Sequence, residues 1–187
     1  MNWISNLFGN RSQGPVAGRW SGHYAQEGRT FPIKATLKHN GSSISGRMLD
    51  LEVCRQQTLQ SILAESGLSD MQIADFLDDV RSQSPESPEG EIEYRSFLPS
   101  ESEIKGSIAD SEISFTKRYM GLQETEYILN GLAMPFSERC ELVQYNGNIN
   151  SNLDFISGTW TIQIPEEDWI EASTFSGDFQ LKRQSAV

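Results

Sequence analysis

The stretch Ile156-Ser157-Gly158 shows the pattern that decides the fold, because an apolar residue is followed, two positions on, by a glycine. Five further stretches share this pattern: Val16-Ala17-Gly18, Ile44-Ser45-Gly46, Ile104-Lys105-Gly106, Leu129-Asn130-Gly131 and Phe175-Ser176-Gly177. Residues two positions apart in a strand face the same side, so each unit places a glycine on the apolar, inward face. Such a glycine leaves room for a large side chain opposite and lets the strand bend sharply. Repeated along one sheet, the pattern predicts a small, strongly coiled antiparallel β-barrel.

Strand-like segments account for most of the chain. In residues 30–39, Phe31, Ile33, Ala35 and Leu37 alternate with polar residues, which is typical of a half-buried strand. Asn40-Gly41 then predicts a two-residue hairpin turn. The first barrel strands are expected within 16–53, at 19–26, 30–39 and 42–53, and the remaining ones within 91–184, at 91–97, 103–109, 112–119, 125–132, 139–144, 155–164 and 174–183. We therefore expect a mainly β fold, an up-and-down barrel of about eight to ten strands.

Two helical features are expected beside the barrel. Apolar residues at helical spacing predict a short N-terminal helix over residues 1–10 and a helical hairpin over 55–82. Ser69 and Gln72 form a capping box at the start of the second hairpin helix. Residues 84–90 read as a polar, proline-containing linker. All 187 residues are expected to form a single domain, with the hairpin as an insertion.

Composition restricts the classes of partner. The chain has a formal net charge of -11, with 37% hydrophobic and 22% charged residues. That charge disfavours nucleic acid and anionic membrane surfaces as partners. No apolar run is long enough for a membrane span, and residues 1–10 lack the features of a signal peptide, so we expect a cytoplasmic location. Cys54 and Cys140 do not make a disulfide framework.

Gly18-Arg19-Trp20, early in the first expected strand, resembles the opening motif of the calycin superfamily: the lipocalins, avidins and fatty-acid-binding proteins. Those proteins also carry a basic residue on the final strand, here Arg183, and the resemblance implies that its side chain stacks on Trp20. Gly158-Thr159-Trp160 repeats the motif late in the chain. Together with the stretches at 115–119, 145–147 and 177–179, it is similar to the second half of bacterial lipocalin-like domains of no assigned function.

The resemblance covers residues 16–53 and 91–184. The insertion at 55–82 departs from avidins and most lipocalins. Fatty-acid-binding proteins have a helix-turn-helix lid between their first two strands, whereas here the helices follow the third. A lid role therefore does not carry over to this chain.

Strand parity assigns a face to two cations. Lys117 and Tyr119 share a face with Ile113 and Phe115, and Arg183 shares one with Leu181. The predicted ligand-binding residues on the inward face are Lys117, Tyr119, Trp20, Tyr24, Trp160 and Arg183. An inward cation must be paired, stacked or at the wet mouth of the barrel.

Two interpretations of these cations stay open. In one, Lys117 and Arg183 hold the anionic group of a ligand while the aromatic residues contact its apolar body. In the other, Arg183 stacks on Trp20 and the Lys117 side chain extends to the rim.

Catalytic and metal chemistry have little support in the sequence. The only histidines are His23, with outward parity, and His39, which we expect in solvent beside a turn. There is no His-x-His or Cys-x-x-Cys spacing for a metal or haem, so no cofactor is expected. No segment marks a catalytic serine.

The sequence favours a non-enzymatic, lipocalin-like barrel that binds a small apolar or amphipathic molecule, including an anionic one. The alternative is a protein-interaction module with a filled barrel, which docks a partner through the helical insertion and the N-terminal segment.

Overall fold

A computed structural model describes residues 14–26, 28–59, 63, 69–82, 92–129, 132–165 and 172–185. The expected N-terminal helix at 1–10 and linker at 84–90 lie outside these residues. The chain forms two compact units. The barrel unit comprises Met1–Leu51, Glu101–Arg118 and Glu141–Val187, and the inserted unit comprises Glu52–Ser100 and Tyr119–Cys140.

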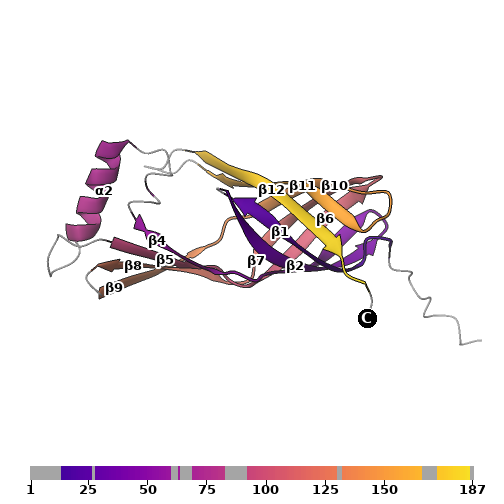
Figure 1. Ribbon diagram of the computed structural model, residues 1–187, viewed down its shortest axis with the longest axis horizontal. Coiled ribbons are helices and arrows are strands. Elements are labelled where there is room, and N and C mark those ends of the chain that lie inside the picture. Colours follow the sequence, from indigo (N-terminus) through magenta and orange to yellow (C-terminus); the bar gives the residue numbers. More distant parts are fainter. Residues whose placement is uncertain are drawn as a thin grey trace, which may run out of the picture. The chain divides into compact units, whose positions relative to one another are not determined.

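The barrel unit is a closed, eight-stranded antiparallel barrel (Figure 1). Its strands are β1 (Gly18–Gln26), β2 (Arg29–Asn40), β3 (Ser43–Asp50), β6 (Glu101–Ala109), β7 (Glu112–Tyr119), β10 (Val143–Ile149), β11 (Phe155–Ile164) and β12 (Ser173–Arg183). Each strand neighbours the preceding barrel strand, and β12 closes the ring against β1. The predicted fold class, a mainly β chain with a closed antiparallel barrel, is confirmed.

Glycines allow neighbouring barrel strands to approach closely. Gly158 is paired with Gly147 on β10, and a Cβ atom on Gly158 would lie 2.1 Å from the carbonyl oxygen of Asn146. A Cβ atom on Gly46 would lie 2.0 Å from the carbonyl oxygen of Thr36. The predicted glycines Gly18, Gly46, Gly106, Gly158 and Gly177 all lie in barrel strands. Gly131 lies outside the described residues.

Alternation along the strands fills the barrel core. On β2, Phe31, Ile33, Ala35 and Leu37 are buried, and the residues between them are exposed. The β2–β3 turn differs slightly from the expected one, since Asn40 pairs with Ser43 and the turn residues are Gly41 and Ser42. Of these two, Gly41 has the positive φ, 63°. A positive φ at the first turn position is the pattern of a type II′ turn, in which glycine is preferred there.

The inserted unit is a four-stranded antiparallel sheet with a helix. Its elements are β4 (Cys54–Thr58), α2 (Asp70–Ser82), β5 (Ile92–Phe97), β8 (Leu122–Leu129) and β9 (Leu132–Arg139), and its strand order is β4-β5-β8-β9. The predicted capping box is present, because the Ser69 backbone N–H donates to Gln72 Oε1 at 3.0 Å. Its small core holds Leu59, Leu63 and Leu77, with Tyr94 and other half-buried residues packed against it.

Three expectations for this region need correction. Residues 55–58, expected as helix, form part of β4, because their backbones pair with Arg95, Ser96 and neighbours on β5. Helix α2 matches the second helix of the expected hairpin. Residues 60–62 and 64–66 of the first expected helix lie outside the described residues. Segments 91–97 and 125–132, expected in the barrel, contribute to the inserted sheet instead. Segment 139–144 spans the end of β9 and the start of β10.

Candidate functional site

The interior of the barrel holds a buried ion pair. Lys117 faces inward from β7, as predicted, and its Nζ atom lies 2.6 Å from Oδ2 and 2.8 Å from Oδ1 of Asp50 on β3. Both side chains are only 1% exposed. The expected extension of Lys117 to the rim is therefore wrong, and the carboxylate on this cation belongs to the chain itself.

Sequence reasoning missed Asp50. It is the last residue of β3, where Ile44, Gly46 and Met48 precede it at alternate positions. Ile44 and Met48 are buried, so the same parity argument that placed Lys117 inward would have found Asp50.

Aromatic rings surround the ion pair. The Tyr24 ring centroid lies 5.7 Å from Lys117 Nζ, and this ring stacks on Phe31 at 5.1 Å. It also meets Trp160 edge-on at 6.0 Å. Trp160 is 2% exposed, and its Nε1 donates to the carbonyl oxygen of Ala25 at 2.9 Å. The predicted residues Tyr24, Trp160 and Lys117 therefore lie together inside the barrel.

A second group of rings extends this core. Tyr145 stacks on Phe115 at 4.8 Å and meets Phe179 edge-on at 4.9 Å. Burial raises the pKa of the Tyr145 hydroxyl well above its ordinary value of 10.0, and Asp50 and Tyr24 raise it further. The hydroxyl therefore stays protonated across the physiological range.

Arg183 and Trp20 meet where the barrel closes. The guanidinium carbon lies 5.3 Å from the Trp20 ring centroid, as the calycin resemblance implies. Arg183 Nη2 donates to the carbonyl oxygen of Ala17 at 2.6 Å and to that of Pro15. Trp20 is fully buried, and its Nε1 donates to the carbonyl oxygen of Val16 at 3.1 Å. Stacking of Arg183 on Trp20 is thus confirmed.

The structure places the two predicted interior cations beside different residues of β1. Lys117 contacts Tyr24, whereas Arg183 contacts Trp20, four positions earlier. Four strand residues span roughly 13 Å, so the two cations do not converge on one carboxylate. Tyr119, the remaining predicted residue, ends β7 and is half-buried.

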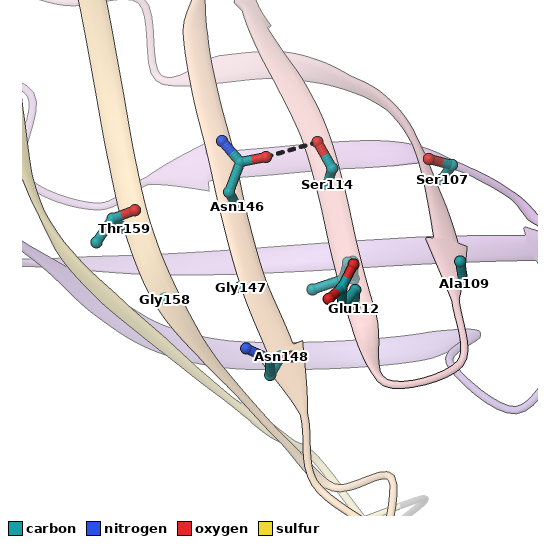
Figure 2. Close-up of a pocket in the computed structure, with 10 residues that line it drawn as sticks. Ser107, Ala109, Glu112, Ser114, Asn146, Gly147, Asn148, Gly158 and Thr159 are labelled. Atoms are coloured by element: carbon teal, nitrogen blue, oxygen red, sulfur yellow. Dashed lines mark hydrogen bonds between the residues drawn. The ribbon is translucent and has the colours of Figure 1, made fainter.

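The outer wall of the barrel carries two hollows. One, of about 420 Å³, lies over β6, β7, β10 and β11 and includes the paired glycines Gly147 and Gly158 (Figure 2). Figure 2 shows Ser114 and Asn146 pointing toward each other, and Ser114 Oγ donates to Asn146 Oδ1 at 2.8 Å. The other, of about 560 Å³, lies over β2, β3 and β6 and is lined by charged residues.

His39, Cys54 and Cys140 differ in their exposure. His39, expected in solvent, is instead 9% exposed, and its Nδ1 accepts from the Val16 backbone N–H at 3.3 Å. Its Nε2 therefore carries the proton and donates to the carbonyl oxygen of Gly41 at 2.6 Å. Cys54 is exposed and Cys140 is half-buried. Within the described residues, no group of three His, Cys, Asp or Glu side chains is placed to hold a metal.

The described helix does not have the length and apolar character needed to cross a bilayer. Comparison with known proteins gives no family model, no curated protein and no solved structure that matches this chain.

Proposed function

We propose that this chain is a non-enzymatic protein-interaction module in which the barrel is a filled scaffold and the inserted unit docks a basic partner. The observation that carries the proposal is the Lys117–Asp50 ion pair, in which each side chain is 1% exposed. A ligand anion at Lys117 would have to replace Asp50 and leave that carboxylate buried and unpaired. Such a loss costs several kcal/mol, which argues against a small-molecule pocket around this cation.

The inserted unit presents an apolar row on its edge strand. Leu132, Met134 and Phe136 share one face of β9. Met134 packs against the core of the unit itself, whereas Leu132 and Phe136 are 51% and 38% exposed. Phe136 stacks on Tyr127 of β8 at 5.4 Å, so its ring is held in place. Exposed apolar side chains in a fixed arrangement are typical of a protein-binding surface.

The edge of β9 suggests how a partner would bind. A proline in a sheet is tolerated where its missing N–H faces away from the neighbouring strand. Pro135 lies in the middle of β9, so the free edge lacks a donor there and addition of a partner strand is disfavoured. We therefore expect a partner to bind through side-chain contacts with the apolar row.

Charge defines the partner. The inserted unit contains 13 Asp and Glu residues against four Arg and no Lys, so it carries a net charge of -9 out of the -11 of the whole chain. Among its exposed carboxylates are Asp70 and Asp75 on α2, and Glu138 follows the apolar row on the same face of β9. A partner with basic residues around an apolar centre complements this surface.

The test uses fluorescence anisotropy with a labelled amphipathic peptide of Lys and Leu, and the matching Glu and Leu peptide as a probe of opposite charge. We expect the basic peptide to bind and Leu132→Ser/Phe136→Ser to weaken binding about tenfold, since buried apolar anchors dominate such interfaces. The matched control is Leu142→Ser/Phe175→Ser, which removes side chains of the barrel unit that are 41% and 40% exposed. Equal weakening by both variants, or no binding of the basic peptide, would refute the proposal.

A ligand-binding barrel is the second candidate. The Arg183–Trp20 stack at 5.3 Å supports it, because the calycin resemblance implies both this closure and a small-molecule pocket. The test is titration with a fluorescent fatty acid and a neutral analogue while tryptophan emission is recorded. Micromolar binding that Lys117→Met weakens tenfold for the anion alone would support an anion-binding pocket. Unchanged emission with both probes would favour the interaction module.

A further inference from the structure

We propose that the outer wall of the barrel over β12, β1, β2, β3 and β6 binds an acidic polypeptide segment in extended conformation. This surface is distinct from that of the inserted unit. The wall carries a basic face, whose residues are Arg19, Lys34, Lys38, Arg47, Lys105 and Lys182, all exposed. These are six of the 15 Lys and Arg residues in a chain of net charge -11. Such clustering makes one wall of the barrel cationic within an acidic protein.

Strand register brings these cations together. Thr36 of β2 pairs with Arg19 on β1 and with Arg47 on β3. One row further along β2, Ser45 of β3 lies between Lys38 and Lys105. In the opposite direction along β2, Ser21 lies between Lys34 and Lys182. Three adjacent cross-strand rows therefore each carry two cations, with a hydroxyl residue between them.

The basic face has a hollow where these rows pass over β2, β3 and β6. A cavity of about 560 Å³ is lined by three successive outward positions on each of three strands. Its β2 wall is Lys34, Thr36 and Lys38. Along a strand, outward side chains recur about every 7 Å, and carboxylates at alternate positions of an extended peptide have the same repeat.

Ion pairs within the hollow leave the β2 side cationic. On the β6 side, Glu101 Oε2 lies 3.2 Å from Arg47 Nη1, and Glu103 Oε2 lies 3.5 Å from Lys105 Nζ. No carboxylate of the described residues forms an ion pair with Lys34 or Lys38. These two ammonium groups can therefore bind carboxylates of a partner without breaking an existing ion pair.

The same two glutamates define the class of partner. A nucleic acid or an anionic membrane presents negative charge throughout, so Glu101 and Glu103 would repel it across the hollow. The overall charge of -11 adds to that repulsion. An acidic polypeptide can place carboxylates against β2 and a neutral or basic side chain against β6.

The experiment measures fluorescence anisotropy of a labelled peptide of alternating Glu and Thr at about 0.05 M salt. Peptides with Gln or Lys in place of Glu are the probe controls. We expect the Glu peptide to bind best and Lys34→Glu/Lys38→Glu to weaken it about tenfold or more. Arg118→Glu/Arg139→Glu changes the net charge equally at exposed positions outside the basic face and should weaken binding less than about twofold. Glu101→Gln/Glu103→Gln should strengthen binding severalfold.

Three results would overturn the proposal. The first is absence of binding by the Glu peptide, and the second is equal weakening by the two charge-reversal variants. The third is binding of a single-stranded oligonucleotide or of phosphatidylserine vesicles as tight as that of the peptide, because the face would then recognise polyanions in general.

Discussion

Lys117 Nζ lies 2.6 Å from Asp50 Oδ2, and the two residues come from strands β7 and β3, which are separated in the barrel by β6. The pair therefore joins two strands that are not neighbours in the sheet. Removing two charges from water offsets most of their mutual attraction, so the pair adds little net stability, but breaking it is costly. We expect the pair to favour one arrangement of the interior over others.

Lys117→Met should destabilise the protein by about 3–5 kcal/mol, because the Asp50 carboxylate would remain buried without a partner. The double variant Lys117→Met/Asp50→Leu should recover most of that loss, since it removes both charges. Urea unfolding followed by circular dichroism gives the free energies. A double variant no more stable than Lys117→Met would contradict a simple pairwise role.

Stability should fall at high pH through two tyrosines. Burial, with Asp50 and Tyr24, raises the pKa of Tyr145 well above 10.0, and burial, with Tyr94 and Glu138, raises that of Tyr127 to about 12. Tyrosines of the unfolded chain titrate near pH 10, so the folded state holds these protons more tightly. The free energy of unfolding should thus be insensitive to these groups below about pH 10 and decrease as pH rises toward about 12.

The measurement is urea unfolding at about pH 8 and about pH 11. Tyr145→Phe should reduce the difference in unfolding free energy between the two pH values, because phenylalanine does not ionise. A difference that is unchanged in Tyr145→Phe and in Tyr127→Phe would show that other groups cause it.

Arg183→Ala should destabilise the barrel by roughly 1–3 kcal/mol, through loss of the stack on Trp20 and of two hydrogen bonds to carbonyl oxygens. Arg183→Lys keeps the charge but not the planar guanidinium, so we expect an intermediate loss. Chemical denaturation monitored by tryptophan fluorescence checks both. If the unchanged protein and both variants were equally stable, the contact between Arg183 and Trp20 would not contribute to stability.

Gly158→Ala should destabilise by about 3 kcal/mol or more, since the added Cβ would lie 2.1 Å from a backbone oxygen and 2.4 Å from the Cα atom of Gly147. The control is Gly41→Ala, where nothing lies within 4 Å and the cost comes from the positive φ alone, about 1–2 kcal/mol. Thermal unfolding compares them. A smaller effect at Gly158 than at Gly41 would mean that the strands can separate without cost.

Parity and glycine spacing predicted the barrel from sequence because both report directly on which face of a strand is buried. They placed Lys117, Tyr24 and Trp160 inside, as the structure has them. They did not predict the Lys117–Asp50 pair. Alternation gives the face of the strand on which each residue lies, but it does not give the register of one strand relative to another. Asp50 ends its strand, where a polar residue is ordinarily exposed.

The inserted unit was harder to predict for a different reason. Segments 92–97 and 122–129 form strands of the inserted sheet, and local sequence predicts a strand without showing which sheet the strand joins. Residues 55–58 contain no glycine or proline that would stop a helix, so only their pairing with β5, a long-range property, distinguishes strand from helix. Helix α2 was predictable because its capping box and its apolar spacing are both local.

Closure of the barrel has a consequence for the order of synthesis. The register that pairs Trp20 with Arg183 joins the earliest barrel strand to the latest one. On the ribosome, β1 can pair with β2 as soon as both emerge, yet its other edge stays open until β12 has been made. Throughout that interval the nascent sheet exposes unpaired strand edges, which favour association with other chains. Closure of the sheet therefore becomes possible only after residue 183 has left the exit tunnel.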